Sequence, residues 1–155
     1  MDEVELKKAR FYALKVINFR PRSVEELTDK LKEKGFPDEV STQVLAEFRK
    51  KGLLDDTKFS RLWINSRMAS NPKGEAVLKR ELKEKGISDQ VAAELLEETK
   101  KDYNEYEVVK KLADGRMVHL GGLDKITAKR RLFGFLKRRG FSTEIIMKVI
   151  SEANK

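Results

Sequence analysis

The chain has 155 residues, no cysteine and a net charge of +8 from 34 basic and 26 acidic side chains. The lack of cysteine excludes disulfide bonds and thiolate metal sites, and no apolar run is long enough to span a membrane. The first residues are acidic and lack the apolar stretch of a secretory signal, so we expect a cytoplasmic protein.

Three helices are predicted near the start of the chain. Apolar residues at helical spacing predict the first helix at about 4–19. Ser23 opens a capping box that starts a second helix, and this helix ends at Gly35, which tolerates a positive φ. A third helix begins near Pro37, because proline suits the first helical turn, and it runs to about Lys51.

Six more helices follow in the same order. They are predicted at about 56–70, 72–85, 88–100, 103–118, 124–139 and from 142 to the end of the chain. Their candidate N-caps are Asp55 or Asp56, Ser88, Asp124 and Ser142. No segment alternates apolar and polar residues for long, so no sheet is predicted. The glycine-bracketed stretch Gly115–Gly122 is expected to be the most mobile.

One segment of the chain occurs three times. When Gly35, Gly86 and Gly140 are aligned, apolar residues recur eight and four positions before each glycine and one, five, nine and ten positions after it. The glycines are 51 and 54 residues apart, just above the period of roughly 20–50 residues that is typical of stacked arrays. We therefore predict an all-α fold of three tandem three-helix repeats, helix-turn-helix-like, in an elongated array. The repeats are placed at 1–54, 55–101 and 102–155. The residues expected to be buried are Leu27, Leu31, Val40, Leu45, Leu78, Leu82, Val91, Leu96, Leu132, Leu136, Ile145 and Ile150.

The excess positive charge lies in the last repeat. Residues 105–155 carry twelve basic and six acidic side chains, whereas residues 1–56 carry twelve of each. At 100° per residue, four basic side chains of the helix at 124–139 point away from its apolar stripe. These are Arg130, Arg131, Lys137 and Arg138. A local basic face favours an anionic partner, and the alternative is a face that is only solvated.

Enzymatic functions lack the residues that they need. The chain has one histidine, His119, and neither a phosphate loop nor a metal-ligand spacing, so we expect no catalytic residue, cofactor or metal. His119 is interpreted as a surface residue, and the Asp55–Asp56 pair as a helix cap. Trp63 is expected in the core, with Arg67 either covering its ring or contacting a partner.

Short segments occur in a fixed order over about residues 9–150. They are Arg22-Ser23, Glu26-Leu27, Lys34-Gly35-Phe36, Gly52-Leu53-Leu54-Asp55-Asp56, Trp63-Ile64, Lys85-Gly86-Ile87 and Phe135-Leu136-Lys137-Arg138-Arg139-Gly140-Phe141. Together they resemble the RecX family, regulators of the RecA recombinase. The resemblance implies a bent array that lies in the groove of RecA filaments on single-stranded DNA. It also implies hindered ATP hydrolysis, strand exchange and filament growth, with effects on the SOS response and recombinational repair.

We expect a non-enzymatic monomer whose partner is a RecA filament, with single- or double-stranded DNA as a further contact. The candidate contact residues are Arg130, Arg131, Lys137 and Arg138, with Arg67, Lys73 and Arg80 in the middle repeat. The alternative is a basic helical DNA- or RNA-binding protein without a RecA target. A base-reading helix-turn-helix is disfavoured in the first two repeats, because Asp38 and Asp89 stand where phosphates would repel them.

Overall fold

The computed structural model describes residues 2–153, and all regular secondary structure in that range is α-helical. The helices are α1 (Glu3–Phe19), α2 (Val24–Glu33), α3 (Asp38–Lys50), α4 (Asp56–Ser70), α5 (Glu75–Glu84), α6 (Asp89–Thr99), α7 (Glu105–His119), α8 (Lys125–Arg138) and α9 (Thr143–Glu152). The prediction of nine helices and no sheet is therefore confirmed for the described residues.

Polar side chains start most of these helices, as the sequence predicts. The side chains of Ser23, Ser88, Asp124 and Ser142 each accept a hydrogen bond from the backbone N–H three residues later. Such a bond satisfies one of the amides that has no partner within the first helical turn. Asp55, and not Asp56, is the N-cap of α4.

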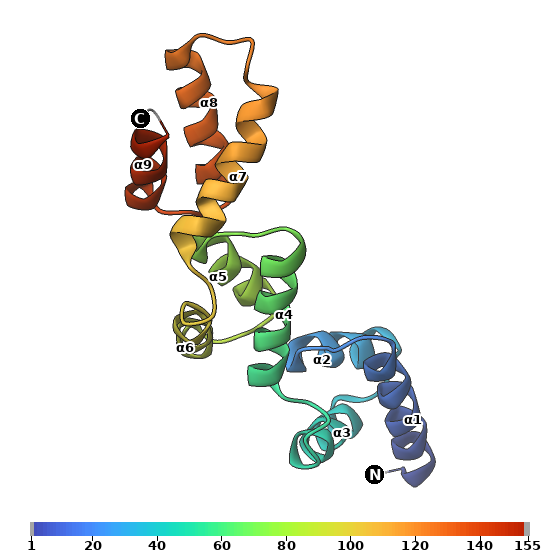
Figure 1. Ribbon diagram of the computed structural model, residues 1–155. Helices are drawn as coiled ribbons and strands as arrows, with labels where there is room; N and C mark the ends of the chain where they lie inside the picture. The colour runs from blue at the N-terminus through green and yellow to red at the C-terminus, as the bar shows by residue number, and fades with distance from the viewer. Residues whose placement is uncertain (1, 154–155) are drawn as a thin grey trace.

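Three consecutive helices form each of three modules. Module 1 contains α1–α3, module 2 contains α4–α6 and module 3 contains α7–α9, and the main helix–helix contacts lie within a module. Each module has its own hydrophobic core. Figure 1 shows the modules in an elongated, bent row with the two ends of the chain far apart. The tandem three-helix architecture is thus confirmed, whereas the boundaries at residues 54 and 101 stay a prediction.

Nine of the twelve predicted core residues are buried, and three are only half-buried. These three, Leu45, Val91 and Ile145, pack against the edges of the cores. At 100° per residue, each lies roughly a quarter-turn from the centre of the buried stripe of its helix. Trp63 is also half-buried and not fully in the core; it packs against Phe59, with 6.0 Å between the ring centroids.

The stretch Gly115–Gly122 lies partly in a helix and partly in a turn. Its first five residues belong to α7, which ends at His119, and only a short turn connects α7 to α8. Leu120 in this turn is 5% exposed and packs into the core of module 3. The helix end predicted near residue 118 is therefore confirmed to within one residue, and the mobility of the stretch stays a prediction.

Neighbouring modules meet where their second helices lie end to end. At the first junction, the Oγ–H of Ser23, the N-cap of α2, donates to the carbonyl of Lys85 at the end of α5 (2.7 Å). At the second, the N–H of Gly74, the N-cap of α5, donates to the carbonyl of Arg139 at the end of α8 (2.7 Å). In both, a positive helix terminus faces a negative one, which is the attractive orientation of the helix dipoles.

Side chains reinforce the first junction. The carboxylate of Glu26 accepts hydrogen bonds from Arg20 (2.7 Å) and from Lys85 of module 2 (3.2 Å). Partial burial alone would raise the pKa of Glu26, but the hydrogen bonds from Arg20, Lys85 and the Ser23 N–H outweigh it and lower the pKa. Asp56 of module 2 accepts a bond from the N–H of Val24 (2.8 Å). The junction is thus polar and specific rather than a continuous hydrophobic core.

Candidate partner-binding surface

Helix α8 carries the basic face predicted from the sequence. Its buried stripe is Ala128, Leu132 and Leu136, each no more than 4% exposed, and this stripe anchors the helix against α7 and α9. The side chains predicted to point outward are indeed exposed: Arg130, Arg131, Lys137 and Arg138. None of the four forms an ion pair with another residue of the described chain. Their positive charges are therefore available to an anionic partner.

Two further basic residues, one within α8 and one at its C-cap, are less exposed than these four. Lys129 and Arg139 are half-buried, as their helical angles predict. Arg139 donates to the side-chain oxygen of Asn71 in module 2 (2.5 Å), so it belongs to the second junction. Lys137 donates to the hydroxyl of Thr143 at the start of α9 (3.0 Å), which restrains its ammonium group near the basic face.

The cap of α8 is electrostatically coupled to this face. Asp124 accepts hydrogen bonds from the side chain and the backbone N–H of Thr127, and these bonds lower its pKa. The positive charge of Arg130 lowers the pKa of Asp124 further. The negative charge of Asp124 at the amino end of α8 interacts favourably with the helix dipole and stabilises the first turn of the helix.

The basic residues predicted in module 2 do not form one free surface. The guanidinium of Arg67 donates to Glu81 (2.6 Å) and lies 4.9 Å from the ring centroid of Trp63. Lys85 lies 5.3 Å from the same centroid. Arg67 therefore covers the tryptophan face, one of the two roles that the sequence left open. Arg80, the residue before Glu81 in α5, is exposed.

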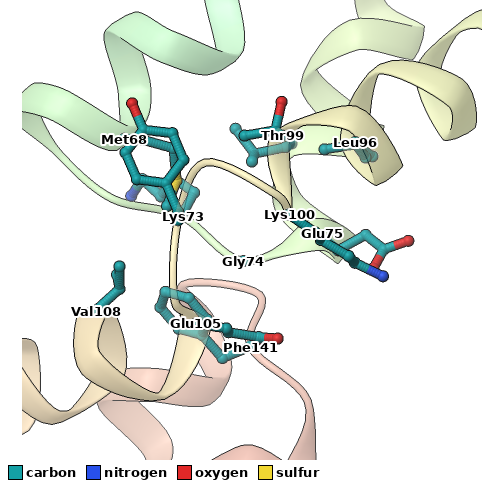
Figure 2. Close-up of a pocket in the computed structure, with 12 residues that line it drawn as sticks. Met68, Lys73, Gly74, Glu75, Leu96, Thr99, Lys100, Glu105, Val108 and Phe141 are labelled. Carbon is teal, nitrogen blue, oxygen red and sulfur yellow. The ribbon is translucent and has the colours of Figure 1, made fainter.

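Lys73 lies beside a small cavity at the second junction. Figure 2 shows this cavity, with Leu96 and Thr99 of module 2 on one side and Val108 and Phe141 of module 3 on the other. Its volume is about 60 Å³, well below the hundreds of cubic ångströms of a typical ligand pocket. The cavity is therefore a feature of the packing between modules rather than a binding site.

Another basic cluster was not identified from the sequence. Lys111, Arg116 and His119 of α7 line a groove between modules 2 and 3, together with Phe135 of α8 and Arg139, the C-cap of that helix. The three-residue spacing of Arg116 and His119 places these two side chains on one side of α7, and this is a signal that sequence reasoning could have used. Phe135 lies under two guanidinium groups, those of Arg116 (4.9 Å) and Arg139 (4.7 Å).

No described helix is both long and apolar enough to cross a membrane. Within residues 2–153, no three or more His, Asp or Glu side chains are grouped so that they could hold a metal ion.

Family models match the chain over three consecutive ranges. The models are described as the first, second and third three-helix domains of RecX, and they match residues 9–48, 55–96 and 102–150. Among solved structures, RecX from Lactobacillus salivarius superposes with a TM-score of 0.88 at 23% identity, covering 97% of both chains. A second crystal structure, of a regulatory protein RecX, gives a TM-score of 0.84 at 21% identity over 94% of this chain and 71% of the other. At these identities, the likeness concerns the fold.

Curated relatives are more similar in sequence. Regulatory protein RecX of Amycolatopsis mediterranei is 35% identical over 150 residues, which cover 97% of this chain and 85% of the relative. Regulatory protein RecX of Streptomyces lividans is 32% identical, with 98% and 79% covered. Three matched domains and a full-length similarity above 30% agree with the three modules of the structure. The chain therefore belongs to the RecX family of regulatory proteins.

Proposed function

We propose that this protein modulates the RecA recombinase by binding along RecA filaments on single-stranded DNA. In this role it hinders ATP hydrolysis, strand exchange and filament growth, and so restrains the SOS response and recombinational repair. It acts as a cytoplasmic monomer and performs no catalysis of its own. The observation that carries the proposal is the similarity to RecX proteins over nearly the whole chain, in all three modules.

The elongated row of modules supports binding along a filament. A molecule built this way presents side chains at points far apart along its length, so it suits a partner with repeating subunits (Figure 1). The exposed basic residues of α8 support an anionic component in the complex, either acidic protein surface or DNA phosphate. These four residues, with Arg80 as a further exposed candidate in module 2, are the proposed contacts.

A titration of RecA ATPase activity tests this proposal. RecA is assembled on single-stranded DNA, and the protein is added at rising molar ratios while ATP hydrolysis is followed. We expect hydrolysis to fall at ratios well below those that saturate free DNA, because a filament-directed inhibitor acts on assembled subunits. Order-of-addition experiments, with the protein added before or after filament assembly, separate hindered growth from inhibition of a complete filament.

The competing function is a nucleic-acid-binding protein without a RecA target. In that case, hydrolysis falls only when the added protein covers the free DNA, and excess single-stranded DNA restores it fully. Measuring how the protein binds to DNA-free RecA, or to RecA on a short oligonucleotide, distinguishes the two functions in the same way. A result of this second kind would contradict the proposed role while leaving the family assignment intact.

A further inference from the structure

The groove between modules 2 and 3 has a chemical character of its own. It follows one side of α7 from Val108 to His119, a length of about 17 Å at 1.5 Å per residue. Its volume is about 610 Å³, roughly ten times that of the cavity in Figure 2. A pocket of this size accommodates several side chains of a ligand.

The floor of the groove is apolar, and its rim is cationic. Met68 of module 2 and Val108, Leu112 and Phe135 of module 3 supply aliphatic and aromatic surface. Lys111, Arg116, His119 and Arg139 supply the basic groups, and the twelve lining residues of the described chain include no Asp or Glu. The Nε of Arg116 is buried and has no acceptor within residues 2–153. The groove therefore combines unburied apolar surface with positive charge that no neighbouring carboxylate neutralises.

Gly115 keeps the middle of this groove open. A glycine in a helix interior reduces helix stability relative to alanine, yet Gly115 lies within α7, at the fifth position from its end. A Cβ added to it would meet no atom within 4 Å, so tight packing is not the reason for the missing side chain. Gly115 itself lines the groove, so the space beside it belongs to the groove.

We propose that this groove binds an acidic segment of another protein, with a large apolar side chain of that segment seated over Gly115. Carboxylates of the segment pair with the exposed ammonium group of Lys111, while the apolar side chain covers half-buried Leu112. About five residues of an extended peptide span the 17 Å length at 3.3 Å per residue. The partner is thus defined by its chemistry, an acidic peptide with apolar anchors.

A single-stranded nucleic acid fits the groove less well. Binding of single strands relies on bases that stack on open aromatic faces. Here the guanidinium groups of Arg116 and Arg139 already lie over the ring of Phe135, at 4.9 and 4.7 Å from its centroid. The rest of the floor is mostly aliphatic, which favours an apolar side chain over a base.

Fluorescence anisotropy with defined probes tests the inference on the full chain. One labelled peptide contains three Glu-Glu-Leu repeats, a control peptide has serine in place of each leucine, and a labelled oligo(dT) reports nucleic-acid binding. We expect the native protein to bind the leucine peptide at least tenfold more tightly than the serine peptide, a difference of about 1.4 kcal/mol. No RecA is present, so the result is independent of the proposed function.

Two pairs of variants separate the groove from general effects of charge or folding. Gly115→Leu fills the groove and should weaken binding of the leucine peptide about tenfold. Gly115→Ala adds only one methyl group and should bind nearly as the native protein does. Leucine and alanine both have a higher helix propensity than glycine, so neither substitution should weaken α7. Lys111→Glu should weaken binding of both peptides. Lys110→Glu, an exposed neighbour outside the groove, is its matched control.

Circular dichroism and thermal melting confirm that each variant retains its helices before the binding data are compared. Equal affinity of the native protein for both peptides would overturn the proposal, because charge alone would then explain binding. Unchanged binding of the leucine peptide by Gly115→Leu would also overturn it. A loss of oligo(dT) affinity in Gly115→Leu without a loss of peptide affinity would assign the groove to nucleic acid instead.

Discussion

A single ion pair links the first and third helices of module 1. Both Nε and Nη2 of Arg10 donate to the carboxylate of Glu47, at 2.8 and 2.7 Å, in a bidentate arrangement. The hydrogen bonds from Arg10, and secondarily from Gln43, lower the pKa of Glu47 from 4.5 to about 2. Because the folded pKa is lowered, the stabilisation is complete above pH 4.5 and is lost as the pH falls towards 2.

We therefore expect Glu47→Gln to lower the midpoint of urea unfolding at pH 7 and to have little effect near pH 2. Helicity followed against urea at several pH values gives this comparison. Glu33→Gln is a suitable control, because Glu33 is 70% exposed and its carboxylate lies 4.0 Å from the ammonium group of Lys30. An equal loss of stability at pH 7 and pH 2 would contradict the ion-pair explanation.

Two leucines of module 1 separate full burial from edge packing. Leu31 is 0% exposed, whereas Leu45 is half-buried at the edge of the same core. We expect Leu31→Ala to cost about 2–5 kcal/mol of unfolding free energy, because it leaves a cavity in a closed core. Leu45→Ala should cost clearly less, since solvent and neighbouring side chains fill the space. Urea denaturation of both variants measures the difference, and equal costs would contradict it.

At the level of single residues, the sequence predicted which helix face is buried but not the depth of each residue. The apolar positions four and eight residues before each repeat glycine are all buried, because one side of a helix must face its neighbours. Leu45, Val91 and Ile145 lie at the flank of that side. Their apolar character alone does not show that they are only half-buried. The exposure of the basic residues of α8 could be predicted because their helical angles direct them away from the buried stripe or to its side.

Among the helices, the most specific feature is the end-to-end contact of α2, α5 and α8. Gly140 follows α8 at φ +94°, and a Cβ added there would lie 2.6 Å from the backbone nitrogen of Val77 in α5. Gly35 has the same φ of +94°, but an added Cβ would meet no atom within 4 Å. The two glycines thus share one backbone conformation and differ in the approach of a neighbouring module.

We expect Gly35→Ala to cost about 1 kcal/mol, because a left-handed backbone is unfavourable for a residue with a Cβ. Gly140→Ala should cost about 1–3 kcal/mol more, because the clash with the backbone of Val77 forces the second junction apart. Thermal unfolding measures the two costs. Small-angle scattering should show a changed shape for Gly140→Ala alone. Equal stability and shape of the two variants would argue against a close junction at Gly140.

The sequence predicted the helices more completely than the contacts between modules. Serine and aspartate caps and glycine ends are local signals, so the helix bounds agree with the structure to within a few residues. The junctions depend on residues that are distant in the chain, such as Ser23 with Lys85 and Asn71 with Arg139. A single sequence does not show such pairs. The groove along α7 was missed for the same reason, since it forms only where modules 2 and 3 meet.

For the whole molecule, the distribution of charge along the row of modules is uneven. The third of the chain that forms module 3 carries a net charge of +6 over residues 105–155, whereas residues 1–56 are neutral overall. Because the modules lie in a row, this asymmetry separates a basic end from a neutral end (Figure 1). Such a dipolar arrangement orients the molecule when it approaches an anionic surface.

The contribution of the basic end can be measured by charge reversal. Replacing Arg130, Arg131, Lys137 and Arg138 by glutamate should weaken binding to RecA–DNA filaments about tenfold or more, because attraction becomes repulsion. Helicity and melting should change little, since exposed substitutions usually shift stability by about 0.5 kcal/mol each. Filament binding by the native protein should also weaken as salt rises, because screening and counterion release both oppose the contact.

Lys32→Glu on the exposed surface of α2 is a reference for a charge change in the neutral module, and it should weaken filament binding much less than the reversal on α8. Co-sedimentation with filaments at several salt concentrations measures both, and the salt dependence should become shallower only in the α8 variant. If that variant binds and inhibits as the native protein does, the basic face is only solvated. The contact would then lie elsewhere, with exposed Arg80 and half-buried Lys73 of module 2 as the next residues to replace, because Arg67 is held by Glu81.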